Sequence, residues 1–342
     1  MLKNLLIGAL SLAIILAVIY LLGPREKLQE LNGNYPSVPI GAAELEAYVS
    51  QKEDTVKGLK PNNEARIIWV DSMSKAKTPY AIVYIHGFGA SPMEGDPVHR
   101  KLAEHFGANL YLARLSEHGI KRNNGLEYLT AEKLVADARE AYMIGKSLGD
   151  SVIVIGTSMG GALSLILASE RPDMQSLLLY SPCVREYGDQ LDAFFEPWQG
   201  YLMEKAMTNE YGVLESPREG DKAKYWSEAY HVNGYASLAV LLRSKMIQKT
   251  FEKVNQPLFL AYYYKDEQHQ DQVVSVPAML EMYEQVDTPG EVKRKQLFPE
   301  AGDHVIASSI TSKDWQGVLD ASIDFLENVA HVPSSSQLVD AI

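Results

Sequence analysis

One serine stands in a setting that would make it a nucleophile. Ser158 lies in the run Gly156-Thr157-Ser158-Met159-Gly160, which follows a Val/Ile-rich segment and opens an apolar one. In a G-x-S-x-G pattern of this kind, a sharp turn from strand to helix exposes the serine oxygen. The glycines leave room for the turn, because a Cβ at either position would crowd the neighbouring backbone. The start of the following helix favours developing negative charge. The pattern predicts Ser158 as a nucleophile in acyl transfer.

A serine nucleophile needs a base, and the base needs a carboxylate that orients it. With this strand–turn–helix arrangement the chain order is serine, acid, histidine. Of the 8 histidines, those after Ser158 are His231, His269, His304 and His331. Only His304 falls in a loop directly after the last predicted strand, where its side chain can return over the strand ends. We therefore predict His304 as the base.

Two aspartates are candidates for the orienting acid. Asp266 lies close to the end of the penultimate predicted strand, and Asp271 follows five positions later. An orienting carboxylate must be held by local packing and backbone amides. Val273 and Val274 would dock the loop behind Asp271, whereas four polar residues follow Asp266. This anchoring favours Asp271 and leaves Asp266 as the alternative.

Amide donors for an oxyanion are expected near the first long strand. The run His86-Gly87-Phe88-Gly89 ends that strand, so a glycine-flanked amide can face the nucleophile. We predict that the backbone N–H groups of Phe88 and Met159 form an oxyanion hole. The alternative is a tight turn that binds no ligand.

The rest of the chain alternates between strand and helix patterns after position 61. Strands are predicted at 65–70, 80–86, 109–115, 152–156, 177–181, 258–264 and 292–298. Helices are predicted between them at 98–106, 131–148, 160–170, 276–285 and 314–329. Near-continuous apolar strands separated by helices predict an α/β fold with a mostly parallel sheet covered on both faces.

Residues 184–256 interrupt this alternation and contain no convincing strand. Helical stretches are predicted at 194–207, 223–230 and 237–254, which indicates a helical lid, since long structureless loops are uncommon. One stretch is crowded with apolar residues, namely Phe194, Phe195, Trp198, Tyr201, Leu202, Met203 and Met207. They would either line an apolar acyl pocket or pack the lid on the sheet, and the helical spacing favours packing.

The N-terminal segment predicts a membrane anchor. Residues 5–22 carry no charge, and 18 residues in a helix span about 27 Å, close to the hydrocarbon thickness. The run exceeds the usual apolar core of a cleaved signal peptide, and no small-x-small site precedes Gly23-Pro24, although cleavage is the competing interpretation. The flanking charges do not decide on which side of the membrane the rest of the chain lies.

The chain is predicted to consist of five parts. Residues 1–23 form the anchor, and residues 24–60 form a tether that includes a short helix at 42–52. The core comprises 61–183 and 257–332, the lid comprises 184–256, and the tail comprises 333–342.

Composition excludes several classes of function. Hydrophobic residues make up 46% and charged residues 22% of the chain, which is ordinary for a globular protein. The net charge of -12 argues against nucleic-acid binding and mildly disfavours acidic substrates. The single cysteine, Cys183, excludes an internal disulfide and a multi-cysteine metal site, and we expect it to be a core residue.

Taken together, the motifs resemble the serine α/β-hydrolase superfamily. The likeness is to the branch with monoacylglycerol lipases, lysophospholipase-like enzymes and bacterial carboxylesterases, and it covers about 65–329. The motifs that carry it are HGFGAS (86–91), RLSEHG (114–119), GTSMGG (156–161), DQVV (271–274) and GDH (302–304). The loop after Tyr264 is longer than in that branch, which keeps Asp266 open as the acid.

The resemblance implies an α/β-hydrolase fold with a helical lid. It also implies hydrolysis of small or lipid-like carboxylic esters through an acyl-enzyme, without metal or organic cofactor. Two alternatives remain. One is a serine aminopeptidase-like hydrolase, for which Glu186, Asp189 and Asp192 are candidates to bind the substrate amine. The other is an inactive binding protein that keeps the fold.

Overall fold

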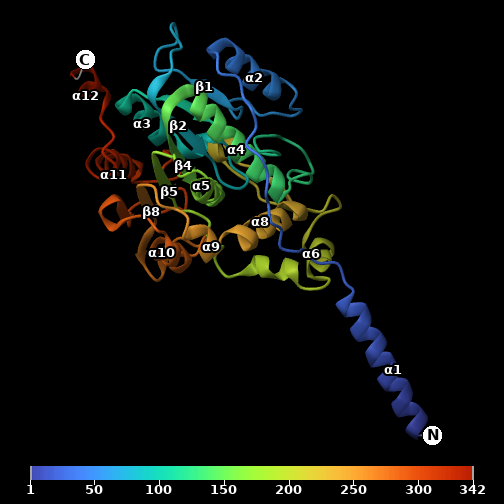
Figure 1. Cartoon of the computed structure of the whole chain (residues 1–342). Helices are drawn as coiled ribbons and strands as arrows, with labels where there is room; N and C mark the ends of the chain where they lie inside the picture. The colour runs from blue at the N-terminus through green and yellow to red at the C-terminus, as the bar shows by residue number, and fades with distance from the viewer. Residues whose placement is uncertain (1, 341–342) are drawn as a thin grey trace.

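A seven-stranded sheet forms the centre of the computed structural model, which describes residues 2–340 (Figure 1). The strand order is β1-β3-β2-β4-β5-β8-β11, and all neighbours are parallel except β1 and β3. The strands are β1 (Arg66–Ile68), β2 (Thr78–Ile85), β3 (Asn109–Leu112), β4 (Gly149–Thr157), β5 (Ser176–Tyr180), β8 (Leu258–Tyr262) and β11 (Lys293–Leu297). The predicted, mostly parallel sheet is confirmed.

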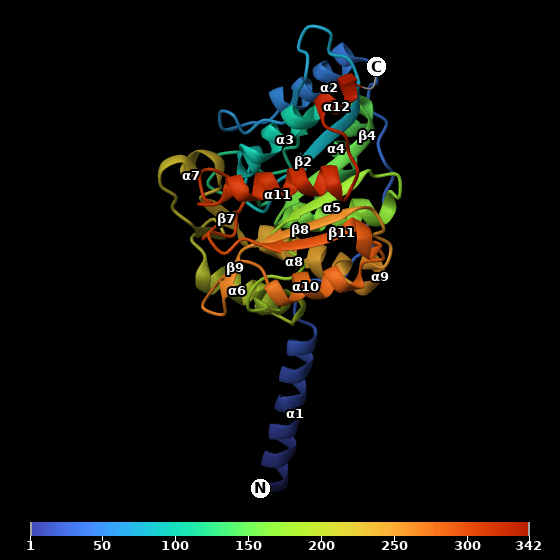
Figure 2. The same ribbon diagram turned by 90° about the vertical axis from the view of Figure 1, so that its left-hand side faces the viewer.

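Helices cover both faces of this sheet (Figure 2). Successive strand residues point to opposite faces, so Ala81 and Val83 join one apolar cluster while Ile82 and Tyr84 join another. The first cluster includes side chains of α4 (Ala131–Leu148), α5 (Met159–Glu170), α8 (Val232–Lys245) and α10 (Val276–Gln285). The second includes those of α3 (Val98–Phe106) and α11 (Trp315–Asn328). A short helix, α12 (Ser335–Asp340), follows α11.

The lid region differs from the all-helical expectation. It contains a two-stranded antiparallel ribbon, in which β6 (Val213–Glu215) pairs with β7 (Ala229–His231). Each strand has only three residues, and α7 (Gly220–Tyr225) lies between them, so neither strand shows a measurable alternation in the sequence. The predicted helix at 223–230 is therefore wrong over its second half.

The first lid helix is also shorter than predicted. A 3-10 turn occupies Gln190–Phe195, and α6 begins only at Gln199 and ends at Met207. The break falls at Pro197 and at Trp198, whose φ is 68°. Proline disfavours helical geometry in the residue before it, so the apolar spacing across 195–202 is not that of one continuous helix. The predicted helix at 237–254 is likewise two helices, α8 and α9 (Gln248–Phe251).

The N-terminal helix α1 (Leu2–Leu21) projects away from the globular part on the side of α6 (Figures 1 and 2). Its mean hydropathy is 2.5 and none of it is buried against the rest of the chain. Its length and composition suit a membrane span, and a signal sequence has the same properties.

The segment after α1 is packed against the globular part, in contrast to the expected free tether. The Glu26 amide donates to the Phe194 carbonyl, and the Gln29 amide donates to Ser244 Oγ. Leu31 is buried, and its carbonyl accepts a hydrogen bond from Arg139. These contacts fix where the chain leaves α1 relative to the lid.

Helix α2 (Ala42–Asp54) holds the loop that follows β3 through a buried ion pair. Arg114 Nε lies 2.6 Å from one Glu53 carboxylate oxygen, and Arg114 Nη2 lies 3.0 Å from the other. Glu53 also accepts from the Ala65 amide, and both paired side chains are 10% exposed. This bidentate geometry fixes the start of the RLSEHG run beside the sheet.

Replacing Glu53 with alanine is expected to lower the free energy of unfolding by about 3–5 kcal/mol, because the Arg114 guanidinium would stay buried without its carboxylate. A matched control is Lys77→Ala, which breaks a pair with Asp150 whose side chains are 45% and 75% exposed. That change is expected to lower it by about 0–1 kcal/mol. Urea unfolding followed by circular dichroism measures both, and similar losses for the two variants would contradict this account.

Candidate active site

The turn at Ser158 has the strained backbone expected of an exposed nucleophile. Ser158 joins β4 to α5 with φ 55° and ψ -120°, a conformation that non-glycine residues rarely adopt. Its amide donates to the Tyr180 carbonyl, and its own carbonyl accepts from the Cys183 amide. A Cβ at Gly160 would lie 2.0 Å from the Ile85 oxygen, so this glycine is required for space.

His304 and Asp271 meet in the structure although 33 positions separate them. His304 Nδ1 lies 2.5 Å from Asp271 Oδ2. Asp271 is fully buried, and its other oxygen accepts the amides of Val273 and Val274 at 2.9 and 3.0 Å. The backbone amides of both valines thus hold the carboxylate, whereas of their side chains only that of Val274 is buried and that of Val273 is exposed. His304 Nε2 is buried and has no hydrogen-bond partner in the described chain.

Asp266, the alternative acid, lies elsewhere. It belongs to a small hairpin of β9 (Tyr264–Asp266) and β10 (His269–Gln270), which accounts for the longer loop after Tyr264. Its carboxylate contacts His269 Nδ1 at 2.8 Å, and the two side chains are 54% and 62% exposed. The structure brings Asp271, and not Asp266, to His304.

The HGFGAS loop lies directly against the nucleophile turn. A Cβ at Gly87 would lie 2.9 Å from Ser158 Cβ, so only glycine allows this approach. His86 fixes the loop: its Nε2 accepts the Leu115 amide at 3.1 Å, and its Nδ1 lies 2.9 Å from the Gly87 oxygen. Burial holds the pKa of His86 well below its ordinary range, so the ring is neutral and donates through Nδ1. Within residues 2–340, the Phe88 amide has no acceptor.

Met159 supplies the second candidate oxyanion donor. It is the first residue of α5, so its amide has no acceptor within the helix. Within the part of the chain that the structure describes, no other acceptor contacts it. Both predicted donor amides are therefore free to bind an oxygen atom beside Ser158.

A cavity of about 720 Å³ connects these groups. Ser158, Met159, Phe88 and His304 line it. The lid contributes several of the apolar residues singled out in the sequence, namely Phe194, Met203 and Met207. Phe194 is also buried in the core, so it both packs and lines the cavity. The cavity can hold an extended apolar group next to the serine.

Sequence reasoning missed a buried carboxylate in this cavity. Glu94 is 2% exposed, accepts the Gly87 amide at 2.5 Å, and lines the cavity with Ser158. Burial raises its pKa to about 7, although the Gly87 amide and the nearby His304 lower it. The only signal in the sequence is its place just after the HGFGAS run, which does not indicate burial.

Cys183 also lines the cavity but has the properties of a core residue. It is 4% exposed, and burial raises the pKa of its thiol well above the ordinary value. A thiol in this state carries little thiolate, which is the reactive form. This agrees with the expectation that Cys183 is a small core residue.

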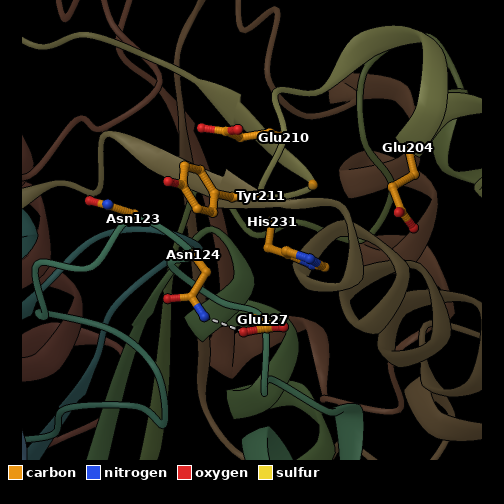
Figure 3. Close-up of a pocket in the computed structure, with 8 residues that line it drawn as sticks. Asn123, Asn124, Glu127, Glu204, Glu210, Tyr211 and His231 are labelled. Atoms are coloured by element: carbon orange, nitrogen blue, oxygen red, sulfur yellow. Dashed lines mark hydrogen bonds between the residues drawn. The ribbon is translucent and has the colours of Figure 1, made fainter.

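A second hollow, of about 510 Å³, shares no lining residue with this cavity (Figure 3). Its wall includes Glu127, Glu204, Glu210 and His231, whose side chains are drawn in the close-up. No group of three or more His, Cys, Asp or Glu residues with the geometry of a metal site occurs in the described residues. The lining of this hollow includes none of the serine, histidine and aspartate residues that the sequence motifs singled out.

Comparison with known proteins gives one sequence relative and several structures. A thermostable monoacylglycerol lipase from Bacillus sp. (strain H-257) is 33% identical over 96 residues, or 28% of this chain and 38% of that protein. The match thus spans well under half of the relative's length. No protein-family model matches the chain.

Solved structures of lipolytic enzymes superpose on most of the chain. One solved chain from work on LipS and LipT, two metagenome-derived lipolytic enzymes, gives a TM-score of 0.61 at 18% identity, covering 79% of this chain and 99% of that one. A soluble variant of monoglyceride lipase from Saccharomyces cerevisiae, in complex with a substrate analogue, gives 0.58 at 12% identity, covering 77% and 91%. The monoacylglycerol lipase of Paleococcus ferrophilus gives 0.55 at 13% identity, covering 77% and 97%. The chain has the α/β-hydrolase fold.

The α/β-hydrolase fold agrees with the resemblance drawn from the motifs. These relatives and structural neighbours are lipases and monoacylglycerol lipases, the class that the motifs indicated. In this fold, ligands bind at the carboxyl ends of the parallel strands. Ser158 follows β4 and Phe88 follows β2, so both lie at that edge.

Proposed function

We propose that the chain is a serine hydrolase of carboxylic esters, with Ser158 as nucleophile, His304 as base and Asp271 as orienting acid. The observation that carries the proposal is the state of His304. Its Nδ1 is held by the buried Asp271, while its Nε2 has no partner and its ring lines the same cavity as Ser158. Nε2 is thus left to exchange a proton with a reacting group.

The reaction follows from these positions. Ser158 Oγ forms a bond to the ester carbonyl carbon as its proton passes to His304 Nε2, and the amides of Phe88 and Met159 bind the resulting oxyanion. His304 returns the proton to the alcohol as the ester C–O bond breaks, leaving an acyl-serine. A water molecule then attacks the acyl carbon as its proton passes to His304 Nε2. The bond between Ser158 Oγ and the acyl carbon breaks, His304 returns the proton to Ser158 Oγ, and the carboxylic acid is released.

A fluorophosphonate tests this proposal without assuming a substrate, because it reacts with activated serines. The full chain in detergent micelles is treated with the reagent, and the adduct is located by peptide mass. Labelling at Ser158 that is absent in Ser158→Ala supports the proposal. A folded chain that is not labelled, or one labelled at another serine, contradicts it.

The lid carboxylates do not favour the aminopeptidase alternative. Glu186 lies 2.6 Å from Arg243, and Asp192 contacts both Arg185 and Arg243. Asp189 pairs with Arg185 as well. Each carboxylate thus has an arginine partner that offsets its negative charge, although Glu186 Oε2 in the cavity wall has no hydrogen-bond partner in the described chain. We therefore propose esters, and not amino-terminal peptide bonds, as the substrates.

We further infer that α1 anchors the protein in a membrane and that the lid lies at its surface. The Trp198 indole donates to the Ile19 carbonyl at 3.0 Å, and its amide donates to the Pro24 carbonyl. Beside this contact, α6 exposes Tyr201, Leu202 and Met207. Such an arrangement suits lipid-like esters drawn from the bilayer. An uncleaved N-terminus and retention in the membrane after alkaline extraction are the expected results, and a mature chain beginning after Gly23 would contradict the anchor.

Replacing Glu94 with glutamine is expected to shift the acid side of the kcat/KM profile to lower pH. His304 must be neutral to accept a proton, so activity is lost as the pH falls through its pKa. Burial lowers that pKa, but the charges of Asp271, Glu94 and Asp303 outweigh burial and hold it above the ordinary 6.5. Glutamine removes one of these charges and still accepts the Gly87 amide. The pKa of His304 therefore falls.

The control for this profile is Glu300→Gln, since the Glu300 side chain is 71% exposed. That variant is expected to keep the profile of the unmodified chain. Burial raises the pKa of Glu94 to about 7, so in the unmodified chain Glu94 and His304 titrate over the same pH range and the kcat/KM profile reports both groups. In Glu94→Gln only His304 titrates, and the acid side of the profile should show a single transition. An acid side that stays in place or moves to higher pH in Glu94→Gln would contradict the prediction.

A further inference from the structure

Arg218 lines the cavity of Ser158 with an unusual lack of partners. It lies between β6 and α7, and its Nη2 is 3.5 Å from the Tyr230 hydroxyl, which is a weak contact. Its Nε is buried and has no hydrogen-bond partner in the described chain. Only the backbone amide of Arg218 contacts a carboxylate, that of Glu228 at 3.4 Å.

This lack of a carboxylate distinguishes Arg218 from the other arginines. Among the side chains of residues 2–338, every arginine has a carboxylate oxygen within 4.0 Å except Arg25, which follows α1, and Arg218. Nε of Arg66 and of Arg122 is buried without a partner as well, but each of these arginines has a carboxylate that balances its charge. The half-buried Arg218 has none, so its charge is available to an anion in the cavity.

The other charged side chains of the cavity wall do not neutralise the positive charge of Arg218. Lys222 and Asp303 pair with each other at 3.1 Å, and Glu186 is held by Arg243. Glu94 accepts the Gly87 amide of the HGFGAS run, and no ion pair joins it to Arg218 in the described chain. Arg218 is thus the cation of this cavity whose charge no side chain neutralises.

Aromatic packing places Arg218 close to the reacting groups. The Tyr230 ring that Arg218 contacts lies 5.7 Å from the Phe88 ring, and Phe88 carries a candidate oxyanion amide. One aromatic side chain therefore separates the guanidinium from the oxyanion loop. A group bound by Arg218 would be attached near the ester, and not at the far end of a long acyl chain.

We propose that Arg218 binds an anionic oxygen group of the substrate, a phosphate or a carboxylate, so that the natural substrates are acyl esters carrying negative charge. This rests on the proposed ester hydrolysis and narrows its substrate class. A guanidinium presents a planar set of donors that matches both anions. The net charge of -12 disfavours such substrates at long range, and Arg218 provides a local cation that offsets this inside the cavity.

Two matched substrate pairs test the proposal on the full chain in detergent micelles. The alcohol side is tested by 1-octanoylglycerol against 1-octanoylglycerol 3-phosphate, and the acyl side by methyl butanoate against monomethyl succinate, whose carboxylate lies close to the ester. We expect Arg218→Gln to lower the anionic-to-neutral ratio of kcat/KM at least about 10-fold in one pair, as for loss of a charge-assisted hydrogen bond. The kcat/KM for the neutral ester of each pair is the reference for the ratio, and the circular dichroism spectrum shows that the variant is folded.

Lys224→Gln is the matched control, because it removes the same charge from the same lid segment outside the cavity. Lys224 pairs with Asp221, and both side chains are largely exposed. An unchanged ratio in both pairs for Arg218→Gln overturns the proposal. An equal fall of the anionic-to-neutral ratio in Lys224→Gln also overturns the proposal. The preference for anionic esters would then come from the long-range electrostatic field of the lid and not from a binding site at Arg218.

A binding measurement separates this proposal from the hydrolase assignment. Hexyl phosphate contains no ester, and its affinity for Ser158→Ala is measured by titration calorimetry with and without Arg218→Gln. A dissociation constant at least about 10-fold higher without Arg218 supports the anion site even if no ester is hydrolysed. Equal affinities in the two chains overturn the site while leaving ester hydrolysis by Ser158 standing.

Discussion

Replacing His304 with alanine is expected to lower kcat for ester hydrolysis about 10⁶-fold, the loss seen when a serine hydrolase loses its base. Without His304, no neutral nitrogen remains beside Ser158 to accept the hydroxyl proton. The oxyanion amides of Phe88 and Met159 would remain and account for the residual rate. Hydrolysis of a p-nitrophenyl ester by the purified chain measures the loss.

Two further measurements make this result specific. The exposed pair of His269 and Asp266 offers a matched control, and His269→Ala is expected to leave kcat unchanged. Removing the His304 ring also opens a space next to Asp271, so added imidazole should restore part of the activity in His304→Ala. Equal losses in the two variants, or a His304→Ala chain that keeps most of its activity, would show that His304 is not the base.

The residues of the proposed site could be singled out in the sequence because the local constraints on them lie in short runs. Gly160 has no space for a Cβ, and the turn at Ser158 demands a strand before it and a helix after it. Asp271 could be preferred to Asp266 because the amides that hold its carboxylate belong to the next residues, Val273 and Val274. In both cases, what positions the side chain is adjacent in the chain.

Features that depend on distant partners could not be predicted in this way. Glu94 is buried because β2, the HGFGAS loop and His304 surround it, and nothing in its neighbouring sequence indicates that burial. Arg218 lines the cavity and, unlike every other arginine of the described chain except Arg25, has no carboxylate near its side chain, which is a property of the fold. The β6–β7 ribbon was missed for a related reason, since three-residue strands are formed by pairing and not by propensity.

The contact between α1 and the lid adds a physical reason for the lid's composition. Trp198 breaks the lid helix and at the same time contacts the end of α1 through Ile19 and Pro24. The apolar residues after it divide accordingly: Met203 lines the cavity, while Leu202 is exposed beside the anchor. Residues 194–207 thus contribute apolar side chains both to the cavity and to the exposed surface beside α1. For this reason, the spacing of their apolar residues fits neither a single packed helix nor a simple acyl pocket.

Replacing Asp271 with asparagine is expected to lower kcat about 10⁴-fold while leaving the fold intact, and the reason lies in its hydrogen bonds. In the unmodified chain, Asp271 Oδ1 accepts hydrogen bonds from the amides of Val273 and Val274. In the variant, the side-chain oxygen of the asparagine must occupy the position of Oδ1, because its NH₂ group there would face two N–H donors. The asparagine NH₂ group then faces His304 Nδ1. Nδ1 becomes the acceptor, the ring proton moves to Nε2, and Nε2 can no longer accept the proton of Ser158.

Asp271→Asn should also shift the dependence of kcat on pH, which a general loss of structure would not do. Because the charge of Asp271 raises the pKa of His304, its removal shifts the acid side of kcat to lower pH, since only Glu94 and Asp303 then oppose the effect of burial. Asp266→Asn removes an equal charge from an exposed pair and is expected to change neither kcat nor the profile. If Asp266→Asn caused the larger loss, the hairpin aspartate would be the acid after all, and His304 would have to change its partner on substrate binding.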